Sequence, residues 1–140
     1  TSLYGHHTGP CQPGFNDRAV MRVDRPWGWY EHLLSGEGYK VKRLLVFKGQ
    51  QLSLQRHQHR SESWTVVSGD GLLLCNNQWV EAHPGVMLTI PVGAVHRARG
   101  GHCDVVIIEV QHGDDLREED IERLQDDYGR VIALPSTFEA

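Results

Sequence analysis

The chain has 140 residues, which is enough for one compact domain with its own core and too few for two domains of ordinary size. A formal net charge of −4 and a pI of about 6.1 predict no basic surface of the kind that follows a phosphate backbone, which argues against a nucleic-acid partner. No apolar run approaches the roughly 20 residues of a membrane-spanning helix, and no signal segment is seen at the start, so we expect a cytoplasmic protein with no membrane partner.

The order of elements along the chain predicts a β-rich body between two tails. Residues 1–20 are rich in glycine, proline and histidine, so we expect an N-terminal arm or tail there, followed by a domain over residues 21–130 and a tail over 131–140. Short segments separated by glycine, asparagine or proline are predicted as strands at Tyr39–Lys48, Gln51–Gln55, Ser63–Ser68, Gly71–Asn76, Gln78–Glu81, Val86–Pro91, Val95–Arg99 and Asp104–Gln111. Their length and spacing predict an all-β sandwich or barrel, with a hairpin turn at Asn76-Asn77.

The segment after the last predicted strand has a different pattern. Leu116, Ile121 and Leu124 would lie near one face of a helix, and acidic residues crowd its first turns, where the helix dipole favours them. Gly129 is placed to end such a helix. We therefore expect a short surface helix over about residues 116–127.

Two glycine-bracketed motifs place metal-binding side chains at fixed spacings. Gln55, His57 and Glu62 stand in the first, and His96 ends the second. Gln55 and His57 share one face of an extended strand, and a tight reversal at residues 58–61 would bring Glu62 beside them from the next strand. Fixed glycines and a proline accompany these residues, a context that the other histidines lack.

The four side chains offer imidazole nitrogens, an amide oxygen and a carboxylate. This mixture suits one divalent metal ion, with zinc favoured and manganese, cobalt, nickel or iron as alternatives. The three cysteines lack CxxC spacing and are predicted to be free thiols, so a thiolate zinc site is not expected. His59 continues the alternation of Gln55 and His57 but lies in the reversal, so it is open to two interpretations, a substrate contact or a turn residue.

The motifs resemble those of the cupins, which implies a double-stranded β-helix, or jelly-roll barrel. Longer strings resemble the type II mannose-6-phosphate isomerase family over about residues 25–130. They are Arg25-Pro26-Trp27-Gly28, Gly38 to Arg43, Leu52 to Trp64, Ile90 to Arg97, Glu109-Val110-Gln111 and Asp126 to Arg130. In that family the cupin domain usually follows a mannose-1-phosphate guanylyltransferase domain. No glycine-rich nucleotide-binding start appears in this sequence, so guanylyltransferase activity is not expected.

The resemblance implies a metal-dependent isomerase that interconverts mannose 6-phosphate and fructose 6-phosphate through an enediol, and it implies a homodimer. Most cupins, and redox cupins in particular, place a histidine where this chain has Gln55, which argues against an oxygenase. Two alternatives stay open: a non-catalytic or regulatory cupin that binds a sugar phosphate, and another metal-dependent cupin enzyme such as an oxygenase.

The residues that move the proton and hold the phosphate are less evident from the sequence. Glu109 is one candidate base because it lies in an otherwise apolar strand, although a salt bridge to a neighbouring strand would explain it equally well. His59 is the other candidate. Lys42, Arg60 and Arg130 are the candidates for the phosphate, since arginine suits bidentate phosphate contacts and lysine acts as a point charge.

Overall fold

The computed structural model describes residues 21–130, so the arm predicted over residues 1–20 and the tail predicted over 131–140 lie outside the described residues. Every regular element in the described part is a β-strand. The strands are β1 Arg22–Arg25, β2 Gly28–Gly36, β3 Tyr39–Val46, β4 Leu54–Arg56, β5 Arg60–Ser68, β6 Gly71–Cys75, β7 Gln78–Ala82, β8 Met87–Ile90, β9 His96–Gly100, β10 Val105–Gly113 and β11 Glu122–Gln125.

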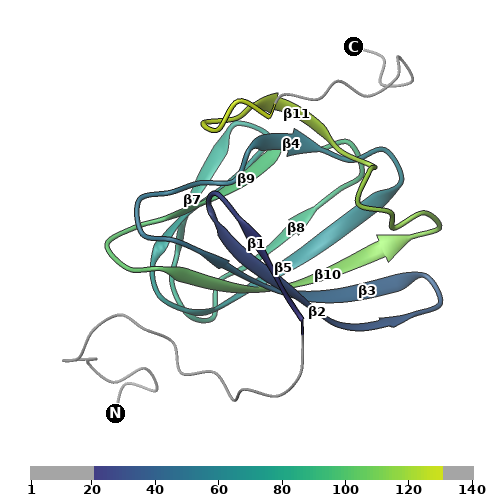
Figure 1. Ribbon diagram of the computed structural model, residues 1–140, viewed down its shortest axis with the longest axis horizontal. Helices are drawn as coiled ribbons and strands as arrows, with labels where there is room; N and C mark the ends of the chain where they lie inside the picture. Colours follow the sequence, from purple (N-terminus) through teal and green to yellow (C-terminus); the bar gives the residue numbers. More distant parts are fainter. Residues whose placement is uncertain (1–20, 131–140) are drawn as a thin grey trace.

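The strands form two antiparallel sheets that enclose a common interior (Figure 1). One sheet has six strands in the order β1-β2-β3-β10-β5-β8, and the other has five in the order β11-β4-β9-β6-β7. Neighbours in each sheet are mostly not neighbours in the sequence, as expected when a chain winds back and forth between two facing sheets. The predicted all-β barrel is confirmed.

The interior changes character along the strands of the six-stranded sheet. One row of paired inward residues, Leu44, Val66 and Ile107, is apolar and buried. The next inward residues on β3 and β10, Lys42 and Glu109, are buried as well but carry ionisable groups. Buried polar groups are costly unless they are paired or used, so this polar end of the barrel is where a functional site is expected.

Turn residues hold the strands in register as the sequence predicts. Asn76 and Asn77 join β6 to β7 with φ angles of 46° and 67°, the left-handed pair that a two-residue hairpin turn requires. Gly69 has φ 84°, and a Cβ there would lie 1.8 Å from the carbonyl oxygen of Asp104, so a larger residue would collide with backbone.

The helix predicted over about residues 116–127 is wrong. Residues 114–130, here named the C-terminal strap, run over the barrel without a helix, and β11 pairs with β4 (Figure 1). Asp120 and Glu122 lie buried against the barrel with 5% and 9% of their surface exposed. A helix would place Asp120 and Glu122 on different faces, because residues two apart are about 200° apart around a helix axis, and it would leave the edge of β4 without its partner. Tertiary contacts therefore override the local helical pattern.

Several smaller predictions are corrected as well. The two strands β1 and β2 were not predicted, and β4 begins at Leu54 rather than at residue 51. Cys75 is a free thiol as expected, whereas Cys103 is disulfide-bonded, so that prediction is wrong for Cys103. Cys11 lies outside the described residues. None of the described residues forms a helix long and apolar enough to span a membrane.

Candidate metal centre and substrate pocket

Three of the four predicted ligands meet at the polar end of the barrel. His57 follows β4, Glu62 lies in β5 and His96 begins β9, and each has at most 2% of its surface exposed. The Nε2 atoms of the two histidines are 3.2 Å apart, and they lie 3.2 Å and 3.7 Å from the oxygens of Glu62. The ligand atoms of all three lie within 4.8 Å of one another.

The orientation of both imidazoles suits a cation. His57 donates from Nδ1 to the carbonyl oxygen of Asp120 at 2.7 Å, and His96 donates from Nδ1 to that of Ala94 at 2.8 Å. In the neutral rings, both Nε2 lone pairs therefore face each other and the carboxylate of Glu62. Nitrogen ligands about 2.0–2.1 Å from one zinc ion lie about 2.9–3.4 Å apart at octahedral or tetrahedral angles, so the 3.2 Å separation fits a shared ion.

Gln55, the fourth predicted ligand, lines the same pocket as Glu62, and its Cα is paired with that of His96. Its amide nitrogen donates to the hydroxyl oxygen of Ser53 at 3.1 Å and to the Ser53 carbonyl at 3.3 Å. No hydrogen bond to its Oε1 atom is found among the described residues. The contacts with Ser53 therefore orient the amide so that its oxygen is the atom available as a ligand.

The electrostatics of the cluster keep His96 and Glu62 in the protonation states that a metal site requires. Burial lowers the pKa of His96 to about 4, so this ring is neutral at physiological pH. Burial acts to raise the pKa of Glu62, but the interactions of its carboxylate with His57, His96 and the cationic Arg60 outweigh burial and hold the pKa well below its usual value. A neutral imidazole beside an ionised carboxylate is the state that binds a metal.

Arg60, a predicted phosphate ligand, is instead held next to the metal-binding cluster. Its Nε donates to Glu62 Oε2 at 2.8 Å, its Nη1 donates to the carbonyl of Arg117, and its Nη2 lies 3.2 Å from His57 Nε2. Only 6% of the residue is exposed. Its positive charge is thus balanced by Glu62, which leaves it poorly suited to hold a phosphate.

Glu109, one of the two candidate bases, lies beside this cluster and is held there by neutral hydrogen-bond donors. The Nε1–H group of Trp64 lies between the two carboxyl groups, 3.1 Å from Glu62 and 3.0 Å from Glu109, and Gln111 donates to the other Glu109 oxygen at 2.9 Å. No salt bridge to Glu109 is found in residues 21–130, so the alternative interpretation of this residue finds no support there. Burial, and then the negative charge of Glu62, raise the pKa of Glu109 to about 8.

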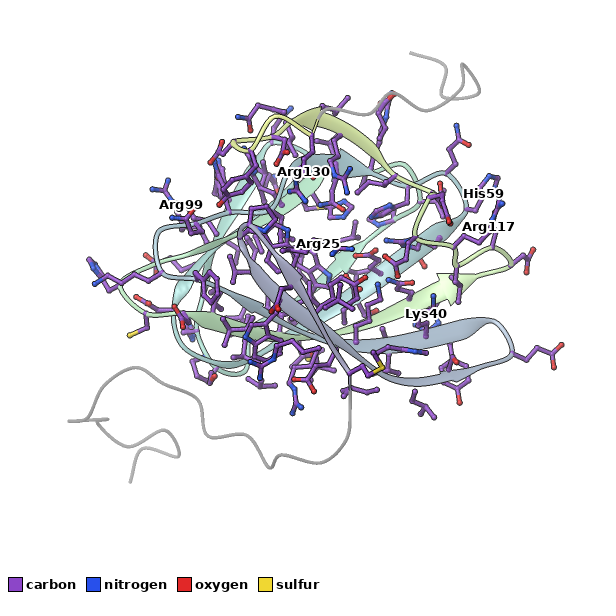
Figure 2. All side chains as sticks on the ribbon, viewed as in Figure 1. Arg25, Lys40, His59, Arg99, Arg117 and Arg130 are labelled. Atoms are coloured by element: carbon purple, nitrogen blue, oxygen red, sulfur yellow. The ribbon has the colours of Figure 1, made fainter. Side chains whose placement is uncertain are left out.

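His59, the other candidate base, does not reach the pocket. Its side chain is exposed, and its backbone N–H donates to Asp120. Figure 2 shows His59 near Arg117 at the outer edge of the molecule. Of the two interpretations, the turn residue is the one that the structure favours.

Lys42, a predicted phosphate ligand, lies in the wall of the pocket, but its charge is already compensated. Its ammonium group forms an ion pair with Glu118 of the strap and lies 4.2 Å from the centre of the Tyr30 ring. Lys40, the next inward residue of β3, donates to the carbonyl oxygen of Leu116 at 2.8 Å. Both lysines therefore hold the strap against the barrel.

Three arginines gather at the rim of the pocket. Arg130, a predicted phosphate ligand, is held by two hydrogen bonds from its guanidinium to Asp126, and Arg25 reaches the rim from β1. Arg123 lies in β11, and no hydrogen bond or ion pair of its side chain is found among the described residues. Burial, and then the positive charges of Arg130 and Arg25, lower the pKa of Arg123, with Asp126 acting in the opposite sense. Three neighbouring cations, one of which has no acidic partner among the described residues, are a candidate site for an anion.

The pocket joins the metal-binding cluster to this rim in a cavity of about 120 Å³. Arg25 and Arg130 lie over the barrel interior in Figure 2. The exposed Arg99 lies at the edge of the molecule opposite to His59 and Arg117. The lining residues are Arg25, Trp27, Tyr30, Lys42, Leu44, Leu52, Ser53, Gln55, Arg60, Glu62, Trp64, Glu109, Glu118, Ile121, Arg123 and Arg130. Arg123 was missed because the strap was predicted to be helical. Its two-residue spacing from Ile121, typical of a strand face, was the signal that could have revealed it.

The chain matches a known protein family over most of its length. The profile of the family described as "Mannose-6-phosphate isomerase C-terminal" matches residues 16–126 of the chain. The chain belongs to this family. All four predicted metal ligands and the paired residues Trp64 and Glu109 lie within the matched range, as does Arg123.

Curated relatives of this family member are considerably longer proteins. "Alginate biosynthesis protein AlgA" of Pseudomonas syringae pv. tomato is 44% identical over 115 residues, which are 81% of this chain and 24% of that protein. "Mannose-1-phosphate guanylyltransferase ManC" of Salmonella typhimurium is 41% identical over 110 residues, 78% of this chain and 23% of that protein. The chain thus spans about a quarter of the length of these relatives.

Solved structures support the fold that the family resemblance implies. A cupin-2 domain from Rhodospirillum rubrum matches with a TM-score of 0.67 at 20% identity, covering 80% of this chain and 85% of that one. The protein described as KdgF from Halomonas sp. matches with a TM-score of 0.62 at 15% identity, covering 71% and 91%. The jelly-roll barrel of the cupins is therefore confirmed as the fold.

Proposed function

We propose that this chain is a metal-dependent isomerase that interconverts mannose 6-phosphate and fructose 6-phosphate. The observation that carries the proposal is that one pocket connects Glu62 of the metal-binding cluster, the Glu109 carboxyl group and Arg123, whose side chain has no hydrogen bond or ion pair within residues 21–130. Membership of the mannose-6-phosphate isomerase family gives further support, because the family is named after the enzyme of this reaction. A metal, a proton carrier and a phosphate anchor are the three parts that the reaction needs.

The metal would be held by His57, Glu62 and His96, with Gln55 as a fourth ligand. Two imidazoles with oxygen ligands favour zinc, and manganese, cobalt, nickel or iron would also fit. A bound divalent ion would supply Lewis acidity toward the sugar carbonyl oxygen without a change of oxidation state. Because Gln55 is a neutral amide and offers little control of a redox potential, an oxygenase is the weaker alternative.

The transfer of a proton between C1 and C2 of the sugar is assigned to Glu109. In the forward direction its carboxylate takes the proton from C2 of the open-chain aldose while O1 takes a proton from solvent, which gives the enediol. Glu109 then delivers its proton to C1 while O2 returns a proton to solvent, which gives the ketose. The absence of an ion-pair partner for this carboxyl among the described residues leaves it free to change charge during the cycle. Trp64 and Gln111 hold its two oxygens in place.

The phosphate is assigned to the arginines of the rim, with Arg123 as its principal ligand. Lys42 and Arg60 are paired with Glu118 and Glu62, so they retain roles in the pocket wall and not in phosphate binding. Arg130 keeps its predicted assignment to the phosphate site in this proposal, and Arg25 is added to it. A guanidinium group can present two parallel N–H donors to a phosphate, which fixes the orientation of the sugar.

A coupled assay of fructose 6-phosphate formation tests the proposal directly. Protein stripped of metal should show no turnover with mannose 6-phosphate, and the addition of Zn²⁺, Co²⁺, Mn²⁺ or Ni²⁺ should restore turnover. His96→Ala should lose both bound metal and turnover, because it removes one of three converging ligands. The control is His59→Ala, which changes an exposed histidine and should retain both.

Two outcomes would count against this proposal. No turnover with any of these metals would contradict the isomerase. If the protein then still bound mannose 6-phosphate, the non-catalytic sugar-phosphate-binding cupin would be the better description. Full metal content in His96→Ala would contradict the assignment of the metal centre.

A further inference from the structure

Asp120 of the C-terminal strap makes three contacts with the loop that carries His57. Its Oδ1 accepts the backbone N–H of Gln58 at 2.9 Å, and its Oδ2 accepts that of His59 at 2.9 Å. Its own carbonyl oxygen accepts the Nδ1–H of His57 at 2.7 Å. Only 5% of the residue is exposed. One residue thus contacts three consecutive residues between β4 and β5.

The two kinds of contact act on the same ligand in different ways. The carboxylate satisfies two successive backbone donors with charge-assisted hydrogen bonds, which locks the path of the loop. The carbonyl fixes the ring of His57 with Nδ1 protonated and Nε2 facing Glu62 and His96. Because the carboxylate docks the strap on the loop, it also determines where the Asp120 carbonyl lies relative to His57.

We propose that Asp120 is a positioning residue for the metal centre and that its carboxylate makes metal affinity depend on docking of the strap. The inference rests on the metal centre of the proposed function, but it does not require the isomerase reaction. In metal sites, a histidine ligand donates the N–H of its other ring nitrogen to a neighbouring acceptor, and this acceptor fixes the tautomer of the ring. Loss of the acceptor typically lowers metal affinity about 10–100-fold.

The two histidines provide an internal comparison. His96 is oriented by the carbonyl of Ala94, two residues away in the same turn, so its support is local. The partner of His57 lies 63 residues away in sequence, on the strap. A change at Asp120 should therefore disturb His57 and leave His96 unchanged, whereas a general loss of stability would disturb both.

The experiment compares Asp120→Ala and Asp120→Asn with Glu119→Ala and Glu119→Gln. Glu119 is the adjacent acidic residue and is exposed, so its variants control for the loss of charge on the strap. The affinity for Zn²⁺ and Co²⁺ is measured by competition with a chelator. The ring ¹⁵N shifts of His57 and His96 are recorded by NMR in the metal-free protein, together with the thermal midpoint of each variant.

We expect Asp120→Ala to bind Zn²⁺ about 10–100-fold more weakly than the unaltered protein. Asp120→Asn keeps one acceptor for the loop and should lose less affinity. In both variants the ¹⁵N shifts of His57 should move toward a mixture of tautomers while those of His96 stay the same, and the Glu119 variants should match the unaltered protein.

The proposal is overturned if Asp120→Asn binds both metals with unaltered affinity, or if His57 keeps its ¹⁵N shifts in a folded variant. Should Asp120→Ala fail to fold, the affinity and NMR measurements on Asp120→Asn decide the outcome. The proposal is also overturned if the unaltered protein binds neither Zn²⁺ nor Co²⁺. The affinity measurement uses no sugar, so a missing isomerase activity would contradict the proposed function and leave the result for Asp120 standing.

Discussion

The two ends of the barrel interior are built on the same strands but serve different purposes. At one end, Val66 and Ile107 pair across β5 and β10 with at most 1% of their surface exposed and pack into the main apolar core. Two residues further along, at the other end, Trp64 pairs with Glu109 in the same two strands. The apolar end gains stability from burial, whereas the polar end buries a carboxyl group at a cost in stability.

In this small domain, the residues that stabilise the fold and the residues of the candidate site occupy different ends of the same strands. The strands extend without interruption through both ends, so the apolar core fixes the backbone on which the polar residues sit. Groups at the polar end are then held by hydrogen bonds to one another, as Trp64 holds Glu62 and Glu109. We expect substitutions at the polar end to affect chemistry more than stability, and substitutions at the apolar end to have the opposite effect.

The largest effect is expected for Glu109→Gln. The substitution keeps the size of the side chain and an acceptor for Trp64, but it removes the carboxyl group that we propose carries the proton. We expect turnover to fall about 10²–10⁴-fold, the range usual for loss of a general base, with metal content unchanged. Because a buried ionisable group is replaced by a neutral one, the free energy of unfolding should stay the same or rise.

Isomerase assays, metal analysis and urea unfolding of the same preparation measure turnover, metal content and the free energy of unfolding separately. Gln111→Glu is not a suitable control, since it would add a second buried carboxyl group, so the matched control is the exposed Glu119→Gln. Turnover of Glu109→Gln within a factor of two or so of the unaltered protein would remove Glu109 from the mechanism.

Prediction from the sequence succeeded where local pattern and tertiary structure agree. Alternation and turn residues located most strands of the barrel, and the glycine-bracketed motifs identified His57, Glu62 and His96, which the structure brings together. It failed for the strap, whose acidic and apolar residues fit a helix equally well. There the structure is decided by contacts with distant residues, such as the pairing of β11 with β4 and the burial of Asp120, which have no local sequence signal.

The wrong helix prediction for the strap also affected the prediction of the site, because Arg123 was assigned to that helix and was not recognised as a candidate phosphate ligand. Its register position in β11, opposite Gln55 of β4, places it over the pocket. The charges that the sequence did single out, Lys42 and Arg60, prove to have acidic partners in the pocket wall. Side-chain type alone cannot distinguish a paired cation from an available one, since the pairing depends on the folded arrangement.

An intermediate effect is expected for Arg123→Ala at the rim of the polar end. Loss of a hydrogen bond to a charged group costs about 1.5–3 kcal/mol, so the KM for mannose 6-phosphate should rise about 10–100-fold. Metal content and the thermal midpoint should stay unchanged, because the rim does not contribute a ligand to the cluster. The control is Arg99→Ala, which removes an exposed arginine far from the pocket.

Steady-state kinetics with mannose 6-phosphate and binding of inorganic phosphate measure this effect. In Arg123→Ala the KM for mannose 6-phosphate should rise and the affinity for inorganic phosphate should fall. In Arg99→Ala both quantities should be unaltered. An unchanged KM and phosphate affinity in Arg123→Ala would place the phosphate elsewhere and return Lys42 to consideration.

The smallest effect is expected for Ile107→Val at the apolar end. Removing one buried methylene from a well-packed core costs about 0.5–1.5 kcal/mol in the free energy of unfolding, which urea denaturation measures. Ile108→Val, on the opposite face of the same strand and only partly buried, is the matched control and should cost less. KM, turnover and metal affinity of Ile107→Val should equal those of the unaltered protein below the unfolding transition. A loss of metal affinity in Ile107→Val at full folding would show that the two ends are mechanically coupled through β10, since Ile107 and Glu109 are separated by a single residue on that strand.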